Sequence, residues 1–164
     1  DWMAAYCRRY GESMQIVIAS QDSDFFQLIS ENVTVLRYRG ESSLLCDAQY
    51  IQEKLGIDPG QCADFKSLTG DTADNIKGAD KVGPKTAAWL LQEFGCLETI
   101  LARAGEISKP SIRASVTQNA ERLRTNYKLI RLTGDVKIPF GAEELGYQYD
   151  GVTTTQVLTA IGLR

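Results

Sequence analysis

The chain has 164 residues, of which 43% are hydrophobic and 24% are charged, and its formal net charge is −3. This length corresponds to about one ordinary domain, with enough apolar material for a core, and no apolar run is long enough to cross a bilayer. The acidic balance is not typical of a nucleic-acid-binding protein, so any basic contact with a polyanion has to be local.

The sequence contains four cysteines and no histidine. Cys7, Cys46, Cys62 and Cys96 lie far apart and form no C-x-x-C pair, which argues against a structural zinc site. We interpret all four as buried apolar thiols. Scattered cysteines and the lack of a visible signal peptide predict a cytoplasmic protein. Without imidazole, hydrolytic chemistry has to rely on carboxylates, metal ions, lysines or hydroxyls.

The first third of the chain reads as short strands and helices. We expect a helix over residues 2–10, strands over 15–19, 33–37 and 43–45, and a short helix over 25–29. Residues 15–19 form a continuous apolar, β-branched run. Such a run is typical of a strand in a parallel sheet that helices cover on both faces.

The rest of the chain reads mainly as helices. Asp47 is a suitable N-cap for a helix through Leu55, and Gly56 ends it. Further elements are expected as helices over residues 59–69, 86–94, 97–102 and 112–132, a strand over 136–138, and a last helix from about residue 153. The pattern predicts an α/β fold, with part of a parallel-sheet core in residues 1–70 and a helical region in residues 71–164.

Two pairs of aspartates lie at the ends of predicted elements. Asp22 and Asp24 follow the strand at 15–19 and share one face of an extended segment, at the edge where open α/β sheets bind ligands. Asp71 and Asp74 are three residues apart on a helical turn and also face the same way. Together they suit a site for hard cations such as Mg²⁺ or Mn²⁺. Ordinary caps and turns are the alternative interpretation of each pair.

The segment from Gly78 to Thr86 is rich in glycine and lysine. It is not a nucleotide phosphate loop, because Pro84 occupies the position of the lysine in that motif and no strand precedes it. A hairpin between two helices fits better, since Pro84 suits a first helical position. Its free amides, flanked by Lys81 and Lys85, would bind a backbone phosphate. An ordinary helical hairpin with solvated lysines is equally compatible.

Five cations follow on the predicted helix over 112–132. Either they extend a track for DNA or they form a solvated helix face, which the pattern favours. They are Arg113, Arg122, Arg124, Lys128 and Arg131.

Three motifs in order resemble the bacterial 5′→3′ exonuclease family, which includes the nuclease domain of DNA polymerase I, stand-alone relatives and, more distantly, flap endonucleases. Residues 20–28, SQDSDFFQL, resemble the family segment S/T-x-D-x-D-x-x-Q-L. Residues 68–76, LTGDTADNI, resemble its G-D-x-x-D-N block, although Lys77 stands where a proline is common. Residues 78–87 resemble the hairpin of its helix–hairpin–helix. The similarity covers roughly residues 1–132.

The resemblance implies roles for these residues. Asp22, Asp24, Asp71 and Asp74 match carboxylates that hold two or more Mg²⁺ or Mn²⁺ ions and carry catalysis, and Asp1 matches the last aspartate of an earlier acidic segment. The hairpin matches a site for the DNA backbone, in which a K⁺ ion can bridge to the phosphate. Its DNA-binding residues would be Gly78, Lys81, Val82, Gly83, Lys85 and Thr86.

The implied activity is 5′→3′ exonuclease or 5′-flap cleavage of DNA, on flapped, nicked or branched duplexes, with a polymerase domain as a candidate neighbour in the parent protein and no membrane partner. The first half of the family's nuclease domain is not in this sequence, so we expect the 164-residue chain to bind DNA weakly and to cleave it poorly. A non-catalytic DNA-binding module and an RNA-cutting relative are the alternatives.

Overall fold

A three-stranded sheet of order β1-β2-β3 organises the first third of the chain. In the computed structural model, which describes residues 1–146, 151 and 153–160, β1 (Ile16–Ala19) is parallel to β2 (Val33–Arg37). β3 (Leu44–Cys46) is antiparallel to β2. α1 (Trp2–Tyr10) precedes the sheet, and the 3₁₀ helix η1 (Ser23–Leu28) connects β1 to β2. The helix expected over 2–10 and the strand expected over 33–37 are confirmed with the same bounds. The first strand begins one residue later than expected, the short helix begins two residues earlier, and the third strand is shifted by one residue.

The two faces of β1 differ, which corrects the expectation of a strand covered on both sides. Ile18 is buried at 4% exposure and belongs to the core, whereas Val17 is 57% exposed. Successive side chains of a strand point to opposite faces. The described residues therefore cover only one face of β1.

The helices that follow the sheet agree closely with the sequence. The Asp47 carboxylate accepts a hydrogen bond from the Tyr50 amide at 2.8 Å, and Gly56 ends the helix with φ of +72°. These caps fix both ends of the helix Ala48–Leu55. The next elements are α2 (Ala48–Leu55), η2 (Pro59–Gln61), α3 (Cys62–Thr69), α4 (Pro84–Phe94), α5 (Leu97–Ala102) and η3 (Ala104–Glu106).

The single long helix expected over 112–132 is wrong. The structure has α6 (Pro110–Gln118) and α7 (Ala120–Ile130), which meet at Asn119 with φ of −103° and ψ of 9°. Residues 136–138 form no strand. After them come η4 (Ala142–Glu144) and α8 (Thr154–Ala160), which confirms the last predicted helix.

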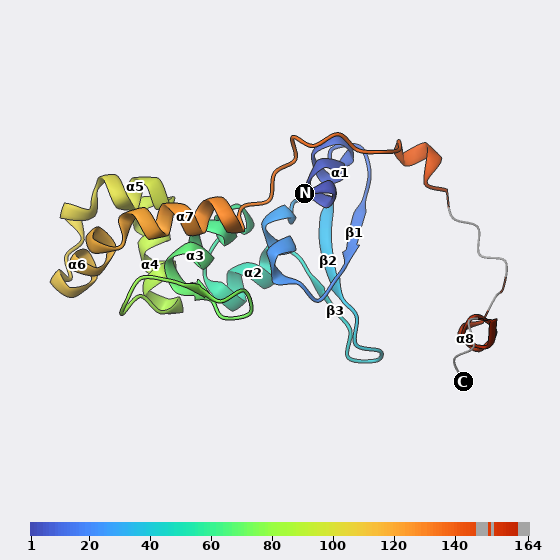
Figure 1. Cartoon of the computed structure of the whole chain (residues 1–164), viewed down its shortest axis with the longest axis horizontal. Coiled ribbons are helices and arrows are strands. Elements are labelled where there is room, and N and C mark those ends of the chain that lie inside the picture. Colours follow the sequence, from blue (N-terminus) through green and yellow to red (C-terminus); the bar gives the residue numbers. More distant parts are fainter. Residues whose placement is uncertain (147–150, 152, 161–164) are drawn as a thin grey trace.

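α3 lies at the centre of the helical region and packs against α4, α5 and α7 (Figure 1). Its residues Cys62, Phe65 and Leu68 are buried, as their spacing predicted. They join a hydrophobic cluster that extends from Ile18 in the sheet to Leu123 in α7. α3 thereby links the sheet to the helices. Of the cysteines, Cys46 and Cys62 are buried, but Cys7 is half-buried and Cys96 is exposed, so the expectation of four buried thiols is wrong.

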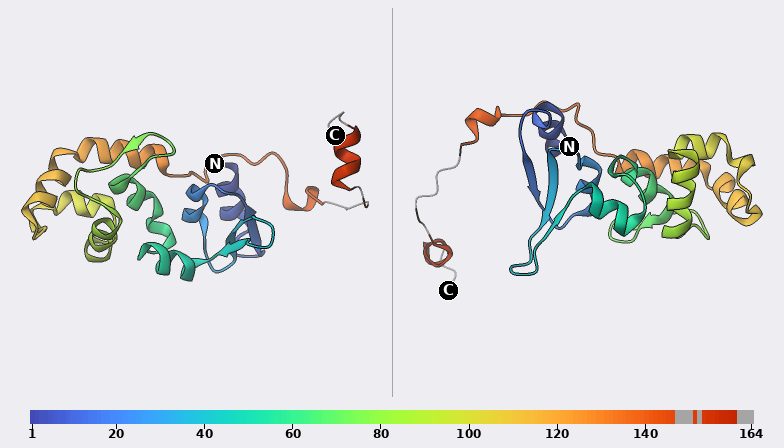
Figure 2. Two further views of the ribbon diagram at one scale, coloured as in Figure 1. Left: turned by 90° about the horizontal axis from the view of Figure 1, so that it is seen from below. Right: turned by 180° about the vertical axis from the view of Figure 1, so that it is seen from behind.

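The chain after α7 returns to the sheet and runs over α1 (Figures 1 and 2). The Thr133 amide donates to the Asp1 carboxylate at 3.0 Å, and the Tyr6 hydroxyl donates to the Phe140 carbonyl at 2.9 Å. These bonds hold the returning segment against α1. Among the described helices, none combines the length and the apolar character that a membrane span requires.

Candidate active site and hairpin

Asp22 and Asp24 lie in the loop between β1 and η1. Asp22 is the N-cap of η1, and its Oδ1 accepts a hydrogen bond from the Asp24 amide at 2.8 Å. The Ser20 hydroxyl accepts from the Asp22 amide at 3.1 Å. Asp22 therefore has the role of a cap, which does not prevent its second carboxylate oxygen from binding another group.

Asp71 lies on the two-residue strand β4 (Gly70–Asp71), directly after α3, and β4 pairs with β5 (Ile76–Lys77). The Oδ1 atom of Asp71 accepts from the Ala73 amide at 2.9 Å. Its Oδ2 atom accepts from Nζ of Lys66 at 2.7 Å. The helical turn expected to carry Asp71 and Asp74 is therefore wrong, because Asp71 lies on a strand and Asp74 in the turn of this ribbon. Strands this short leave no periodic pattern that would predict them.

Lys66 joins the two acidic segments, because its Nζ forms ion pairs with Asp24 as well as with Asp71. The side chains of Lys66, Asp24 and Asp71 are only 17%, 21% and 13% exposed. Burial opposes the charge on Lys66, but the hydrogen bonds to both aspartates outweigh it and raise the pKa of the ammonium group. The hydrogen bond from Lys66 lowers the pKa of Asp71. The Asp71 carboxylate is therefore charged near neutral pH, and Asp24 and Asp71 converge on one cation.

This arrangement bears on the metal site that the sequence predicts. A cationic nitrogen occupies the point at which Asp24 and Asp71 meet, and carboxylate oxygens are the ligands that Mg²⁺ and Mn²⁺ prefer. The donor set thus fits a hard cation in kind. Within residues 1–146, 151 and 153–160, however, no group of three or more His, Cys, Asp or Glu side chains is placed to hold a metal ion.

Among the described side chains, the other three predicted ligands, Asp22, Asp74 and Asp1, form no ion pair with Lys66. Asp74 is exposed in the turn between β4 and β5. The Asp1 carboxylate accepts from the Thr133 amide, at the start of α1. Their roles as ligands stay predictions.

The predicted hairpin connects β5 to α4. Gly78 is packed so closely that a Cβ atom there would lie 2.3–2.4 Å from backbone atoms of residues 68–70. Val82 is buried at 4% exposure and anchors the turn, so only its backbone can face a ligand. Lys81, Gly83 and Lys85 are exposed, and Gly83 is the N-cap of α4. No ion pair of Lys81 or Lys85 occurs in the described structure.

The cations of α6 and α7 serve mainly local contacts. Arg122 donates to the Gly78 carbonyl at 2.8 Å and so braces the hairpin. Arg113 donates to the Ile107 carbonyl, and Arg124 forms ion pairs with Glu98 and Glu121. Neither the DNA track nor the solvated helix face describes these three arginines fully, because each contacts a partner within the chain.

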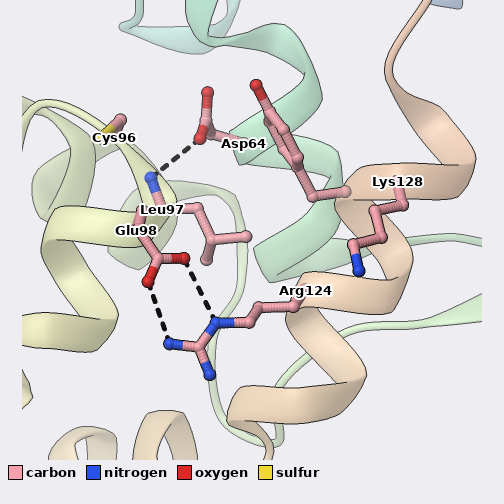
Figure 3. Close-up of a pocket in the computed structure, with 7 residues that line it drawn as sticks. Asp64, Cys96, Leu97, Glu98, Arg124 and Lys128 are labelled. Carbon is pink, nitrogen blue, oxygen red and sulfur yellow. Dashed lines mark hydrogen bonds and ion pairs between the residues drawn. The ribbon is translucent and has the colours of Figure 1, made fainter.

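A pocket of about 200 Å³ between α3, α5 and α7 lies elsewhere and includes Arg124 and Lys128 (Figure 3). Within it, the Asp64 carboxylate accepts from the Leu97 amide at 2.8 Å, at the start of α5. Burial raises the pKa of Asp64. The carboxylate has the structural role of stabilising the first turn of α5, and the pocket contains none of the predicted site residues.

Lys66 was not predicted as a site residue, and Arg122 was named only as one of five cations on a predicted helix. The contacts that give these two side chains a role reach other elements: Lys66 pairs with Asp24 of η1, and Arg122 donates to the Gly78 carbonyl of the hairpin. Only the position of Lys66 five residues before Asp71, on the helix that ends at the acidic block, hinted at a role.

Comparison with known proteins shows the family to which the chain belongs. The family described as "5′-3′ exonuclease, C-terminal SAM fold" matches residues 57–152, which is more than half of the chain. The chain belongs to this 5′-3′ exonuclease family. The resemblance predicted from the three motifs is thus confirmed.

Its curated relatives include nucleases and polymerases. The chain is 35% identical to a DNA polymerase I of Rhizobium leguminosarum over 88% of its own length and 14% of the relative's. It is 33% identical to a 5′-3′ exonuclease of Buchnera aphidicola, over 80% of this chain and 47% of that one. The chain therefore spans less than half the length of these relatives.

The fold agrees with that of a solved exonuclease. A structure of the T5 5′-exonuclease with zinc bound has a TM-score of 0.68 at 24% identity, covering 78% of this chain and 48% of that one. At this identity the likeness shows the fold alone. It confirms the predicted fold class of an α/β core followed by a helical region.

Proposed function

We propose that this member of the 5′-3′ exonuclease family contributes carboxylates to a divalent-metal site that hydrolyses DNA phosphodiester bonds, in 5′→3′ exonuclease or 5′-flap cleavage. The observation that carries the proposal is the convergence of Asp24 and Asp71 on Lys66 Nζ. Two carboxylates from separate motifs need a cation between them, because their charges otherwise repel. Residues 1–70 would then carry most of this site, and residues 71–164 the DNA contacts.

Asp24 and Asp71 are the residues that would hold Mg²⁺ or Mn²⁺, with Asp22, Asp74 and Asp1 as further candidates. When bound, such ions lower the pKa of water and offset charge that builds on the phosphate. In the metal-free chain, Lys66 would neutralise the two carboxylates. After metal ions bind, it would remain beside the phosphate. Since the described residues contain no group of three possible ligands, we expect the 164-residue chain to cleave DNA slowly.

The hairpin would bind the backbone of the duplex. Lys81 and Lys85 extend from an exposed turn at the start of α4, where backbone amides favour anions. Contacts of this kind read no sequence and weaken steeply as salt rises. We also propose that carbonyl groups of the hairpin bind a K⁺ ion. The Gly78 carbonyl already accepts a hydrogen bond from Arg122.

Calorimetric titration with Mn²⁺ tests the metal site. We expect the wild-type chain to bind Mn²⁺, and the double variant Asp24→Asn/Asp71→Asn to bind at least roughly ten-fold more weakly. The variant Glu12→Gln/Glu53→Gln removes the same charge from two exposed positions and serves as the control. Equal binding by all three proteins would contradict the proposed ligands and favour a non-catalytic DNA-binding module.

Fluorescence anisotropy with a labelled 5′-flapped DNA duplex, in EDTA, tests the hairpin. The variant Lys81→Gln/Lys85→Gln should bind DNA more weakly. The slope of log K against log salt concentration should decrease in magnitude by about 1.8, since each phosphate contact contributes about 0.9. The same duplex with an RNA flap, incubated with Mn²⁺, tests the alternative of an RNA-cutting relative. Preferential cleavage of the RNA flap would favour that alternative.

A further inference from the structure

A second concentration of positive charge lies at the turn between β2 and β3. A hollow of about 280 Å³ is formed there between this turn and α2. The residues that line it are Arg37, Arg39, Ser42, Leu44, Tyr50 and Lys54. Three of these six side chains are cations and none is an acid, in a chain whose net charge is −3.

These three cations are not neutralised by neighbouring acids. Within the described part of the chain, no ion pair involves Arg37, Arg39 or Lys54. The closest acids along the sequence have other roles or positions. Asp47 caps α2, Glu53 accepts from Gln49 at 2.8 Å, and Glu41 is exposed at the tip of the turn. The hollow therefore keeps its positive charge available to an anion.

Arg37 is held in a fixed position at the inner end of the hollow. Its guanidinium lies 5.9 Å from the centre of the Phe26 ring, and Nη2 donates to the Gln21 carbonyl at 3.2 Å. Nε is buried and finds no acceptor among the described atoms. The guanidinium thus has fewer acceptors than its five N–H groups can use. A preordered donor of this kind costs little entropy when it binds an oxyanion.

The hollow is connected directly to the loop that carries the acidic site. Gln21 accepts from Arg37 through its carbonyl and donates through its side chain to the Tyr38 carbonyl at 2.7 Å. Asp22 is the next residue. A strand of DNA bound at the aspartates would therefore have this basic hollow as its neighbour. The helix–hairpin–helix turn follows α3 and lies on a different element (Figure 1).

We propose that the hollow between the β2–β3 turn and α2 binds a backbone phosphate of the DNA strand that passes the Asp22–Asp24 loop. The inference rests on the proposed function and adds a second DNA anchor to it. Arg37 fixes the phosphate, and Arg39 and Lys54 add charge from the exposed rim. Leu44, which is 41% exposed, and the ring of Tyr50 provide an apolar side for the sugar or a base.

The test measures the affinity for the same 5′-flapped duplex by anisotropy in EDTA, at several salt concentrations. The variant is Arg39→Gln/Lys54→Gln, which removes two exposed cations and leaves Arg37 in place. The control Arg9→Gln/Lys137→Gln removes the same charge from two exposed positions, one in α1 and one in the segment after α7, neither of which lines the hollow. We expect binding to weaken roughly ten-fold and the salt slope to fall by about 1.4–1.8 in the variant but not in the control.

The outcomes separate this inference from the proposed function. If Lys81→Gln/Lys85→Gln weakens binding but Arg39→Gln/Lys54→Gln matches its control, the hollow is not a DNA site and the hairpin proposal stands. If the wild-type chain does not bind the duplex, the proposals of DNA binding by the hollow and by the hairpin are both wrong. If inorganic phosphate raises the melting temperature of the wild type but not of Arg39→Gln/Lys54→Gln, while both bind DNA equally, the hollow is a site for small anions and the inference is overturned.

Discussion

Nζ of Lys66 lies 2.7 Å from Oδ2 of Asp71, five residues further along the chain, and also forms an ion pair with Asp24. The lysine comes from α3, and the two aspartates come from segments that are 47 positions apart in the sequence. One partly buried cation thus links the two acidic motifs.

The variant Lys66→Met should lose stability without metal, because it leaves two poorly exposed carboxylates without a partner. We expect a loss of about 1–3 kcal/mol in urea denaturation at pH 7, less than for a fully buried pair. Mn²⁺ should stabilise the variant more than the wild type, because in the variant the ion does not compete with an ammonium group for the carboxylates. Lys77→Met, which removes an exposed lysine, is the control. A variant that is destabilised but unaffected by Mn²⁺ would show that Lys66 is purely structural.

The two glycines of the hairpin should respond differently to a methyl group. A Cβ atom at Gly78 would clash with backbone, whereas one at Gly83 meets nothing within 4 Å, and Gly83 has φ of −88°. Gly78→Ala should therefore lower the melting temperature strongly, and Gly83→Ala should leave it nearly unchanged. If DNA approaches the backbone at Gly83, Gly83→Ala should still weaken DNA binding in the anisotropy assay. Unchanged affinity would place the phosphate elsewhere on the hairpin.

Much of the fold was predictable where local signals are strong. α2 follows from the Asp47 cap and Gly56, and α3 and α4 follow from apolar residues at helical spacing. The break between α6 and α7 was not predictable, because Ile112, Val116 and Leu123 keep their spacing across it. At the break, the Asn119 side chain donates to the Ser115 carbonyl at 2.8 Å, a contact available to an asparagine in many settings.

The candidate site was predictable only in part. The motifs identified Asp22, Asp24, Asp71 and Asp74 as a set, and the structure brings Asp24 and Asp71 together on Lys66. Lys66 itself, Arg37 and Arg122 donate hydrogen bonds to partners that are 16 or more residues away, apart from the Lys66–Asp71 pair. Sequence spacing carries no information about such contacts, which depend on how α3, α7 and the sheet pack.

Asn126 connects α7 to the segments on either side of the acidic block. The side chain is 5% exposed and donates to the Ser67 carbonyl at 3.2 Å and to the Lys77 carbonyl at 2.9 Å. Asn126→Ala would leave both carbonyls without this donor, so we expect a loss of about 2–4 kcal/mol in urea denaturation. Thr125→Ala, which removes a hydroxyl at an exposed position on the same helix, is the control. A loss no larger than in the control would mean that water replaces the amide.

Asp64 should give the stability of the chain a specific dependence on pH. Burial raises its pKa in the folded state, so the folded chain binds a proton there over a range in which the unfolded chain has lost it. The contribution of Asp64 to stability is therefore largest below about pH 4, the ordinary range of an aspartate, and decreases as the pH rises through the folded-state pKa. The groups facing it across the pocket are Cys96, Glu98, Arg124, Tyr127 and Lys128.

Two substitutions separate the charge of Asp64 from its hydrogen bond. Asp64→Asn keeps an oxygen that can accept from the Leu97 amide but removes the buried charge, so it should be more stable than the wild type at pH 7, with a smaller advantage near pH 4. Asp64→Ala loses the acceptor as well and should cost about 1–2 kcal/mol. Urea denaturation at both pH values measures these differences. An asparagine variant that is less stable at pH 7 would mean that attraction between the carboxylate and the N-terminus of α5 outweighs the cost of burying it.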